Sequence, residues 1–368
     1  MSLPVTSFQD TLGPYQLLRV LGEGGMGTVY LALDPALQRE VAIKVLRAKN
    51  GQAAKRFLRE AQSAARLNHP HVVTIYMIEP AGARPYIVME YVAGGSLAQR
   101  LRTNGPLHWR QAAGAMRDAL RALAAAHQAG IVHRDVKPAN LMCARDAQGR
   151  EITKLADFGL ARLVQATDAD LTFPGAFVGS PSYCSPEQIA GAVHIDGRAD
   201  LYSLAATGYA LLTGQPPFLA DEPAEVMDRH LNEAFPDARL LAPTVPAEMQ
   251  ELLDKASRKN PAQRYRGAQE MLEAVERLLK LPADGNAKPI AKVRPVAGVP
   301  EVSRAEESVA ELESQLAWAR EHSDSDTQLS ALRTLYGLYA QLDRRQDAVR
   351  TFREALVVHV KMHAPTDN

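Results

Sequence analysis

The stretch Ile131-Val-His-Arg-Asp-Val-Lys-Pro-Ala-Asn-Leu141 carries most of the information in this chain. Two apolar residues, expected to end a strand, lead into a polar loop that holds Asp135, Lys137 and Asn140. Asp157-Phe-Gly159 comes seventeen positions after Asn140 and follows a second expected strand end, Lys154-Leu-Ala156. A structural role would explain any one of these polar side chains, but it does not explain all four at this spacing. The pattern therefore indicates a catalytic site.

A glycine-rich stretch, Gly22-Glu-Gly-Gly-Met-Gly-Thr-Val29, lies between segments that are rich in β-branched residues. Glycines at Gly22, Gly24 and Gly27 let the backbone approach phosphates, because no Cβ blocks them and amide groups can face the charge. Dinucleotide-binding loops share this spacing, but they need a helix directly after the glycines, and Val29-Tyr-Leu-Ala does not look like a helix start. A β-hairpin is preferred. The expected antiparallel strands are Tyr15–Leu21, Thr28–Leu33 and Glu40–Leu46.

Lys44 lies in the third of these strands among apolar neighbours, so its ammonium is partly desolvated unless it meets anions. A lysine that reaches the surface is the alternative for this short motif alone. The next segment, 53–67, has apolar residues at helical spacing and carries Glu60 in its middle. An ordinary surface glutamate is the alternative for Glu60.

Together these motifs resemble those of bacterial Hanks-type (eukaryotic-like) serine/threonine protein kinases, from about Tyr15 to about Leu281. The resemblance implies an α+β, two-lobed protein-kinase fold over 15–281. A small β-rich N-lobe would cover 15–91 and a larger helical C-lobe 92–281. Residues 1–14 would be an N-terminal extension.

The resemblance also implies a role for each residue of the polar loop. Asp135 would accept or orient the proton of the attacking hydroxyl, and Lys137 would neutralise charge on the γ-phosphoryl group of ATP. Asn140 and Asp157 would hold Mg²⁺, with Mn²⁺ as the alternative cation. A lysine at position 137 favours serine or threonine as the acceptor, since tyrosine kinases usually place other residues there.

ATP would lie under the glycines, with Glu60 holding Lys44 on the α- and β-phosphates. The apolar segment 86–92 resembles the strand that leads into the hinge between the lobes. There the backbone of Glu90 to Val92 would bond the adenine edge, with Met89 at the back of the pocket. Val29, Ala42 and Met142 would sandwich the ring, and plain core packing describes these apolar residues as well.

Residues 160–186 look like an activation segment that contains several hydroxyl side chains. Thr172 is the first candidate for phosphorylation and Thr167 the second, and a phosphate there could pair with Arg134. A merely solvated polar loop is the alternative. Ser180 stands where threonine is usual, and it keeps the hydroxyl expected to bond Asp135 and Lys137 near the protein substrate.

Three further residues are expected to be structural by the same resemblance. Glu187 should pair with Arg264, and Asp200 should brace the backbone of the catalytic loop. Cys184, close to the docking site, is better explained as a small buried filler than as a reactive thiol. The expected helices of the C-lobe are 109–129, 200–213 ending at Gly214, 224–233, 247–257 and 268–281.

The chain after Leu281 differs in character. Residues 282–300 are proline-rich without periodicity and indicate a linker. Helical spacing resumes in 301–363, and part of it resembles a tetratricopeptide repeat, although Tyr336 replaces the usual glycine. This appendage could bind a protein partner or a second copy, and a generic helical hairpin is the alternative. Its pattern residues are Leu332, Leu335, Tyr336, Tyr339, Ala348, Phe352 and Ala355.

Composition limits the other functions. Lys plus Arg and Asp plus Glu are 42 each, so no overall charge favours nucleic acid or an anionic membrane. The apolar runs are shorter than the roughly 20 residues that span a bilayer, and Met1–Asp10 lacks the pattern of a signal peptide. With only two cysteines, a cytoplasmic location is expected.

The sequence is thus best interpreted as an active, autophosphorylating serine/threonine kinase of bacterial signalling. A nucleotide-binding pseudokinase scaffold that recruits partners through its tail is the main alternative. Intact Lys44, Glu60, Asp135, Asn140 and Asp157 argue against it. A small-molecule kinase is a third option, and the docking end of the activation segment favours a protein substrate instead.

Overall fold

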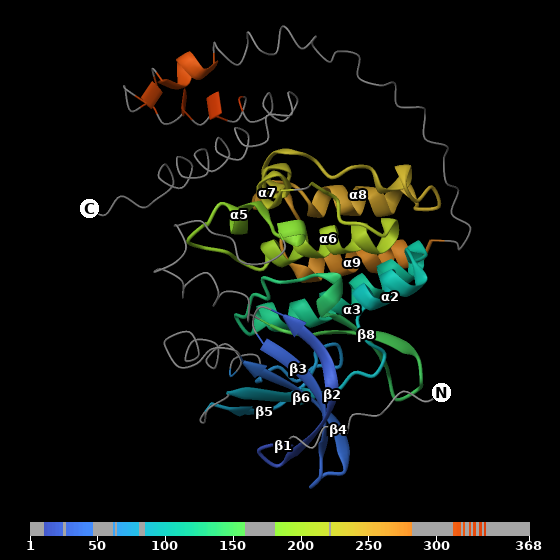
Figure 1. Cartoon of the computed structure of the whole chain (residues 1–368). Helices are drawn as coiled ribbons and strands as arrows, with labels where there is room; N and C mark the ends of the chain where they lie inside the picture. The colour runs from blue at the N-terminus through green and yellow to red at the C-terminus, as the bar shows by residue number, and fades with distance from the viewer. Residues whose placement is uncertain are drawn as a thin grey trace, which may run out of the picture.

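The computed structural model describes residues 11–24, 27–46, 62, 65–80, 85–158, 181–220 and 222–281, and short pieces between 312 and 335. Strands gather at one end of the molecule and helices at the other (Figure 1). This is the two-lobed arrangement expected from the sequence. The two lobes are joined at residues 90–96, between the last strand of the sheet and the first helix of the C-lobe.

The N-lobe is a six-stranded antiparallel sheet in the order β1-β2-β3-β4-β6-β5. Apolar side chains of alternate residues, such as Ala32, Val41 and Ile43, make its core. The two-residue strand β1 precedes the first strand that the sequence predicts. The strands are β1 (Thr11–Leu12), β2 (Tyr15–Gly24), β3 (Gly27–Asp34), β4 (Arg39–Leu46), β5 (Ile75–Glu79) and β6 (Tyr86–Glu90).

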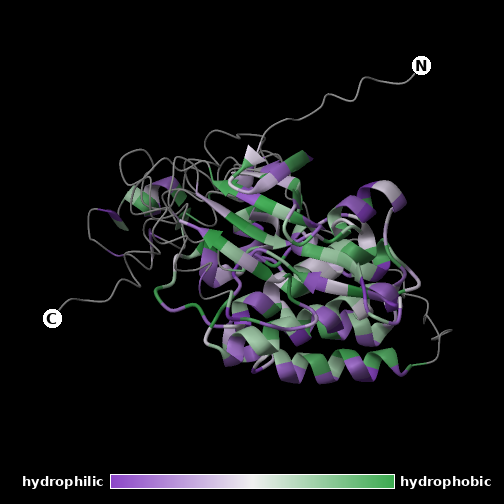
Figure 2. Cartoon of the chain, turned by 90° about the horizontal axis from the view of Figure 1, so that it is seen from below, coloured by the Kyte–Doolittle hydropathy of each residue, from purple (hydrophilic) through white to green (hydrophobic). Residues whose placement is uncertain are grey.

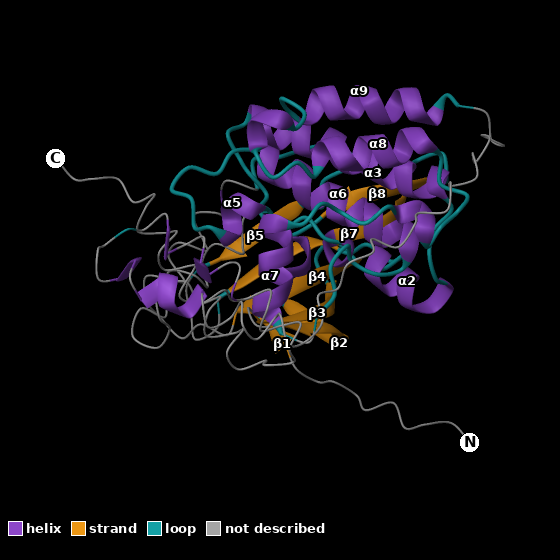
Figure 3. Cartoon of the chain, turned by 90° about the horizontal axis from the view of Figure 1, so that it is seen from above, coloured by secondary structure: helices purple, strands orange, loops and turns teal. Residues whose placement is uncertain are grey.

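The C-lobe is built around helix α6, in which every residue from Ala199 to Leu212 is buried. Helix α3 packs against α6, α9 and strand β8 (Figure 3). The outer helices alternate hydrophobic and hydrophilic residues, as surface helices do (Figure 2). The helices are α2 (Leu97–Asn104), α3 (Trp109–Gln128), α5 (Pro186–Ile189), α6 (Arg198–Thr213), α7 (Pro223–Asn232), α8 (Ala247–Ala256) and α9 (Ala268–Leu279).

A two-stranded hairpin of β7 (Leu141–Arg145) and β8 (Glu151–Leu155) lies beside the hinge. The catalytic stretch comes directly before β7, and Asp157 comes directly after β8. The hairpin therefore brings together residues that the sequence analysis grouped by spacing alone.

The expected helices are confirmed to within two residues at each end, and α6 ends at Gly214 with a left-handed φ of 84°. The expected strand at Ile131 and Val132 is wrong. The amide of Ile131 donates to the carbonyl of Ala126 at the end of α3, and the amide of His133 donates to the carboxylate of Asp200. These donors are therefore not available for a sheet, although the apolar, β-branched pair is typical of one.

Other predictions lie outside the described residues. They include Glu60 and most of its helix, Thr167, Thr172, Ser180 and the linker 282–300. In the tail, the Asp324 carboxylate accepts a hydrogen bond from the amide of Thr327, where helical residues resume. The tetratricopeptide-like pattern stays a prediction. In the part of the chain that the structure describes, no helix is long and apolar enough to cross a membrane.

Candidate active site

The catalytic loop, His133 to Asn140, is held by one buried carboxylate. Asp200, on α6, is fully buried and accepts hydrogen bonds from the backbone amides of His133 (2.8 Å) and Arg134 (2.7 Å). Its Oδ2 also bonds Nε2 of His127 at the end of α3, at 2.8 Å. Two helices of the core thus fix the start of the loop, as expected for Asp200.

His133 connects this loop to the segment around Asp157. Its Nε2 lies 2.9 Å from the carbonyl oxygen of Ala156, and its Nδ1 lies 3.2 Å from the amide nitrogen of Asp135. Because the amide is a donor and the carbonyl an acceptor, the two contacts fit the tautomer that carries its proton on Nε2. Its ring also contacts that of Phe158, with centroids 4.6 Å apart.

The three polar residues of the loop meet at the Asp135 carboxylate. Lys137 Nζ lies 2.9 Å from Oδ2 of Asp135, and Nδ2 of Asn140 donates to the same oxygen at 3.0 Å. The Asn140 amide also donates to the backbone oxygen of Asp135 at 2.8 Å. Oδ1 of Asp135 has no partner among the described residues, so it remains available to accept a proton.

Two residues of the site have left-handed backbone conformations that only glycine adopts easily. Arg134 has φ of 65° and Asp157 has φ of 61°. Such residues cost about 1–3 kcal/mol each and persist where the surroundings hold them. For Arg134 the restraint is visible, because Asp200 binds its amide and Nε2 of Gln188 donates to its carbonyl at 2.8 Å.

Asp157 forms an ion pair with Lys44 across the two lobes, with Nζ and Oδ1 2.9 Å apart. Burial by itself would raise the pKa of Asp157, but the ammonium of Lys44 outweighs it and holds this pKa below the usual value. Asp157 is therefore a carboxylate at neutral pH. Lys44 is buried in β4, directly opposite Val29 of β3 and Ile87 of β6.

The side chains of Asn140 and Asp157 have the chemistry of a site for a divalent cation. Both amide hydrogens of Asn140 are donated to Asp135, which leaves its carbonyl oxygen free to act as a ligand. Asp157 adds a carboxylate whose second oxygen is not used by Lys44. Hard oxygen ligands of this kind suit Mg²⁺.

The residues predicted to enclose the nucleotide lie in the sheet and in the β7–β8 hairpin. Ala42 lies opposite Met89, and Met142 of β7 bridges to Ser96 just after the hinge. The glycines belong to the β2–β3 hairpin, with Gly22 opposite Val29 and Gly24 opposite Gly27. A Cβ at Gly27 would lie 2.0 Å from the carbonyl oxygen of Val45, so this position requires glycine.

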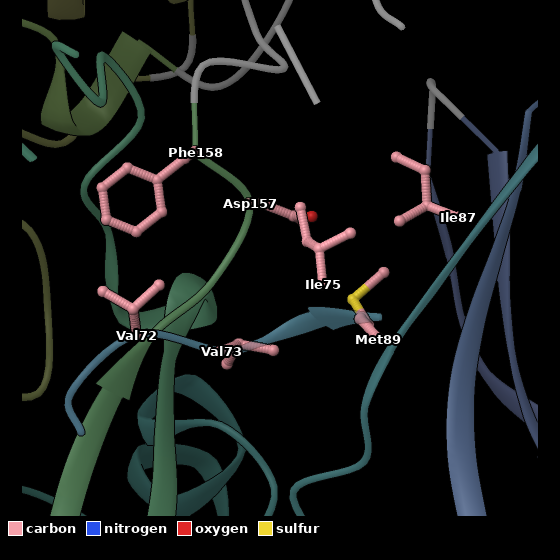
Figure 4. Close-up of a pocket in the computed structure, with 7 residues that line it drawn as sticks. All are labelled: Val72, Val73, Ile75, Ile87, Met89, Asp157 and Phe158. Carbon is pink, nitrogen blue, oxygen red and sulfur yellow. The ribbon is translucent and has the colours of Figure 1, made fainter. Parts of the chain in front are cut away.

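A small cavity lies between Met89 and the Asp157–Phe158 pair (Figure 4). Its volume of about 20 Å³ has room for roughly one water molecule. Met89 and Asp157 thus line the same small cavity. The remaining lining is apolar and consists of Val72, Val73, Ile75 and Ile87.

The expected ion pair of Glu187 and Arg264 is present and bidentate, with N–O distances of 2.6 and 2.7 Å. Arg264 is fully buried there. Burial raises the pKa of the Cys184 thiol to about 12, so this half-buried cysteine is poorly nucleophilic, as expected of a filler.

Sequence reasoning missed several residues that position the site. They include His127, Gln188, Thr207 and the ion pair of Glu90 with Lys154 (2.6 Å). Each acts through a contact between segments that lie far apart in the chain. For Lys154 there was a signal, since a charged residue stands in an apolar strand three positions before Asp157.

Comparison with known proteins agrees with this geometry. Residues 15–275 match the family described as protein kinase domain. The chain therefore belongs to the protein kinase family.

Among its relatives are bacterial serine/threonine kinases. It is 43% identical over 275 residues to serine/threonine-protein kinase PknB of Mycolicibacterium smegmatis, covering 73% of this chain and 43% of that protein. It is 42% identical over 262 residues to serine/threonine-protein kinase PrkC of Bacillus subtilis, covering 70% of this chain and 39% of that protein. The chain thus spans about two fifths of the length of these relatives.

A solved structure shows the same fold. The crystal structure of Rad53 residues 1–466 in complex with AMP-PNP superposes with a TM-score of 0.59 at 24% identity. The match covers 71% of this chain and 64% of that one. At this identity it supports the fold alone.

Proposed function

We propose that this protein is a bacterial serine/threonine protein kinase that transfers the γ-phosphoryl group of ATP to hydroxyl groups of proteins. The observation that carries the proposal is the meeting of Lys137 and Asn140 on one oxygen of Asp135. This arrangement leaves Oδ1 of Asp135 to face a substrate hydroxyl. The relatives PknB and PrkC, both named serine/threonine-protein kinases, support the same activity.

In this proposal Asp135 takes the proton of the serine or threonine hydroxyl as its oxygen bonds the γ-phosphorus. The bond from that phosphorus to the β–γ bridging oxygen breaks, and ADP keeps the electron pair. Lys137 and Lys44 supply positive charge to phosphate oxygens. Asn140 and Asp157 would hold a divalent cation, which would add positive charge beside the phosphates. We propose Mg²⁺ for this cation, with Mn²⁺ as a substitute.

We assign the nucleotide to the pocket of the N-lobe and the hinge. The glycines of β2–β3 would cover the phosphates, and Val29, Ala42 and Met142 would enclose the adenine ring. The backbone of Glu90 and Val92 would bond its edge, with Met89 behind. Asp157 now holds Lys44, and Glu60 would pair with that lysine when Asp157 serves as a ligand of the cation.

The remaining assignments rest on sequence. We propose autophosphorylation at Thr172, or at Thr167, and substrate docking at Ser180. Domain limits of 15–281 for the kinase, 282–300 for the linker and 301–363 for a tetratricopeptide-like segment are proposed too, with partner binding or self-association through that segment. Two free cysteines are consistent with a cytoplasmic location.

The test is transfer of labelled phosphate from ATP with magnesium, comparing the intact chain with Asp135→Asn. We expect the variant to lose about 10²- to 10³-fold in rate, as for other removed charge-stabilising groups. Asp146→Asn, in the β7–β8 turn, is a matched control, because asparagine keeps the Oδ1 that accepts from Gln148 and Arg150.

Mass spectrometry of the labelled protein identifies the modified residues. Label at Thr172 or Thr167 that is absent in Asp135→Asn would support autophosphorylation. Nucleotide binding without transfer to any protein would overturn the proposal in favour of a pseudokinase scaffold.

A further inference from the structure

The hinge carries an ion pair that has no part in the chemistry described above. Oε1 of Glu90, at the end of β6, lies 2.6 Å from Nζ of Lys154 in β8. The side chains are 23% and 16% exposed, respectively. The pair therefore joins β6 of the N-lobe sheet to the β7–β8 hairpin of the C-lobe, in a largely water-excluded setting.

The second carboxylate oxygen of Glu90 holds a third segment. Oε2 accepts a hydrogen bond from the amide of Thr74 at 3.2 Å, and the amide of Glu90 donates to the Thr74 carbonyl at 2.8 Å. Next to Thr74, the amide of Val73 donates to the carbonyl of Leu155 at 3.0 Å. Residues 73–74, 90 and 154–155 are thus joined pairwise in a closed ring of contacts.

Lys154 is placed to affect both halves of the site. It lies directly opposite Met142 in the β7–β8 register, so the two side chains share a face of the hairpin. Met142 is the proposed floor of the adenine pocket. Three residues after Lys154 comes Asp157, which holds Lys44. A shift of β8 at Lys154 would therefore change both the adenine pocket and the metal-binding aspartate.

We propose that Glu90 and Lys154 form a positioning clamp, which fixes the hinge backbone and β8 relative to each other so that adenine binds to a preformed site. Both act through other residues, and neither side chain touches the reacting atoms. The proposal rests on the proposed function for its kinetic readout only. Direct nucleotide binding tests it separately.

The experiment compares Glu90→Gln, Lys154→Met and the double variant in the full chain. Binding of ADP with magnesium is measured by calorimetry, and KM for ATP and kcat are measured by phosphate transfer. We expect each single variant to weaken nucleotide binding and raise KM by about tenfold, in the range of couplings between contacting charges. We expect kcat to change less than threefold, and the double variant to be no worse than the singles.

A matched control comes from the same strand. Glu151 begins β8 and pairs with Arg100 of α2 at 2.5 Å, which is a contact within the C-lobe. Glu151→Gln removes an ion pair from β8 without touching the hinge, so we expect wild-type KM and affinity. Unfolding curves of all variants verify that the comparison is made between folded proteins.

The possible outcomes separate the two proposals. Wild-type nucleotide affinity in both Glu90→Gln and Lys154→Met would overturn the clamp. A gain in kcat/KM would overturn it too, because the ion pair would then lower the activity of the enzyme. An equal loss of affinity in Glu151→Gln would also overturn it, since any disturbance of β8 would then suffice. If the wild type binds nucleotide but transfers no phosphate, the proposed function fails while the binding comparison still decides the clamp.

Discussion

The catalytic loop and the glycine-rich hairpin both belong to the site, but they are held in place by different means. The loop from His133 to Asn140 has no strand or helix before its last three residues. Side chains of α6 and α5 bind its backbone, and His127 of α3 bonds the Asp200 carboxylate that does so. The β2–β3 hairpin is held by the ladder of its own backbone. Single side chains should therefore decide the geometry of the loop, whereas the hairpin should depend on what its backbone allows.

Among single substitutions, Asp200→Ala should have the largest effect on the loop. The substitution leaves the amides of His133 and Arg134 and the ring of His127 without their buried acceptor. Leaving buried polar partners uncompensated costs about 3–5 kcal/mol. We expect a loss of this size in urea denaturation, together with loss of phosphate transfer.

Asp200→Asn is the informative companion, because it keeps the shape and one acceptor oxygen. We expect it to retain more stability than Asp200→Ala and to remain impaired in kcat. Wild-type stability and rate in Asp200→Ala would show that the loop keeps its conformation without this side chain. The proposed difference between the loop and the hairpin would then be wrong.

The same difference explains how much the sequence could predict. The Glu187–Arg264 pair and the bracing by Asp200 were predicted correctly, because each of these residues stands in a short motif that resembles the family's. The residues predicted to be catalytic do meet at the Asp135 carboxylate, and their roles stay a prediction. The strand at Ile131 and Val132 was wrong because their apolar character does not reveal where the amides go. The Ala126 carbonyl accepts from the amide of Ile131, and Asp200 accepts from the amide of the next polar residue, His133. Such partners are visible only once the chain is folded.

Gly27→Ala tests whether the β2–β3 hairpin depends on what its backbone allows. Gly27 has φ of 154°, and a Cβ there would lie 2.0 Å from the Val45 carbonyl oxygen. We expect a loss of about 1–3 kcal/mol in stability, the cost of a strained backbone, and a higher KM for ATP. Gly22→Ala is the control for stability alone, since a Cβ at Gly22 meets no atom of the chain within 4 Å. Equal behaviour of the two variants would contradict a backbone requirement specific to Gly27.

Dependence on buried polar side chains extends to His230 on α7. His230 is fully buried, bonds Tyr202 through Nδ1 at 2.8 Å, and has Lys259 bound to its carbonyl. Burial, reinforced by the charge of Lys259, lowers the pKa of His230 to about 3. The unfolded chain takes up this proton near pH 6.5 and the folded chain does not, so stability falls as pH drops below 6.5.

At pH 5 this single histidine should remove about 2 kcal/mol of the stability present at pH 7. Urea denaturation of the wild type and of His230→Gln across pH 5 to 7.5 isolates the effect from the carboxylates. We expect the stability of the variant to depend less steeply on pH by about that amount. Parallel curves would mean that His230 is protonated in the native state as easily as in the unfolded chain.

The smallest expected effect concerns a single hydrogen bond between α6 and the loop. The hydroxyl of Thr207, buried on α6, lies 3.2 Å from the carbonyl oxygen of Val136 in the catalytic loop and 2.8 Å from that of Ser203. Thr207→Val keeps the volume and removes the donor, so we expect a loss of about 1 kcal/mol in urea denaturation. Thr213→Val is the control, because its hydroxyl bonds the Tyr209 carbonyl four residues back but does not reach the loop. Both variants lose a hydrogen bond within helix α6, but only Thr207→Val also loses the bond to the loop. A lower kcat in Thr207→Val but not in Thr213→Val would therefore show that the Val136 carbonyl needs this bond. Equal kcat in the two variants would mean that the loop is positioned through its amide groups, which Asp200 binds.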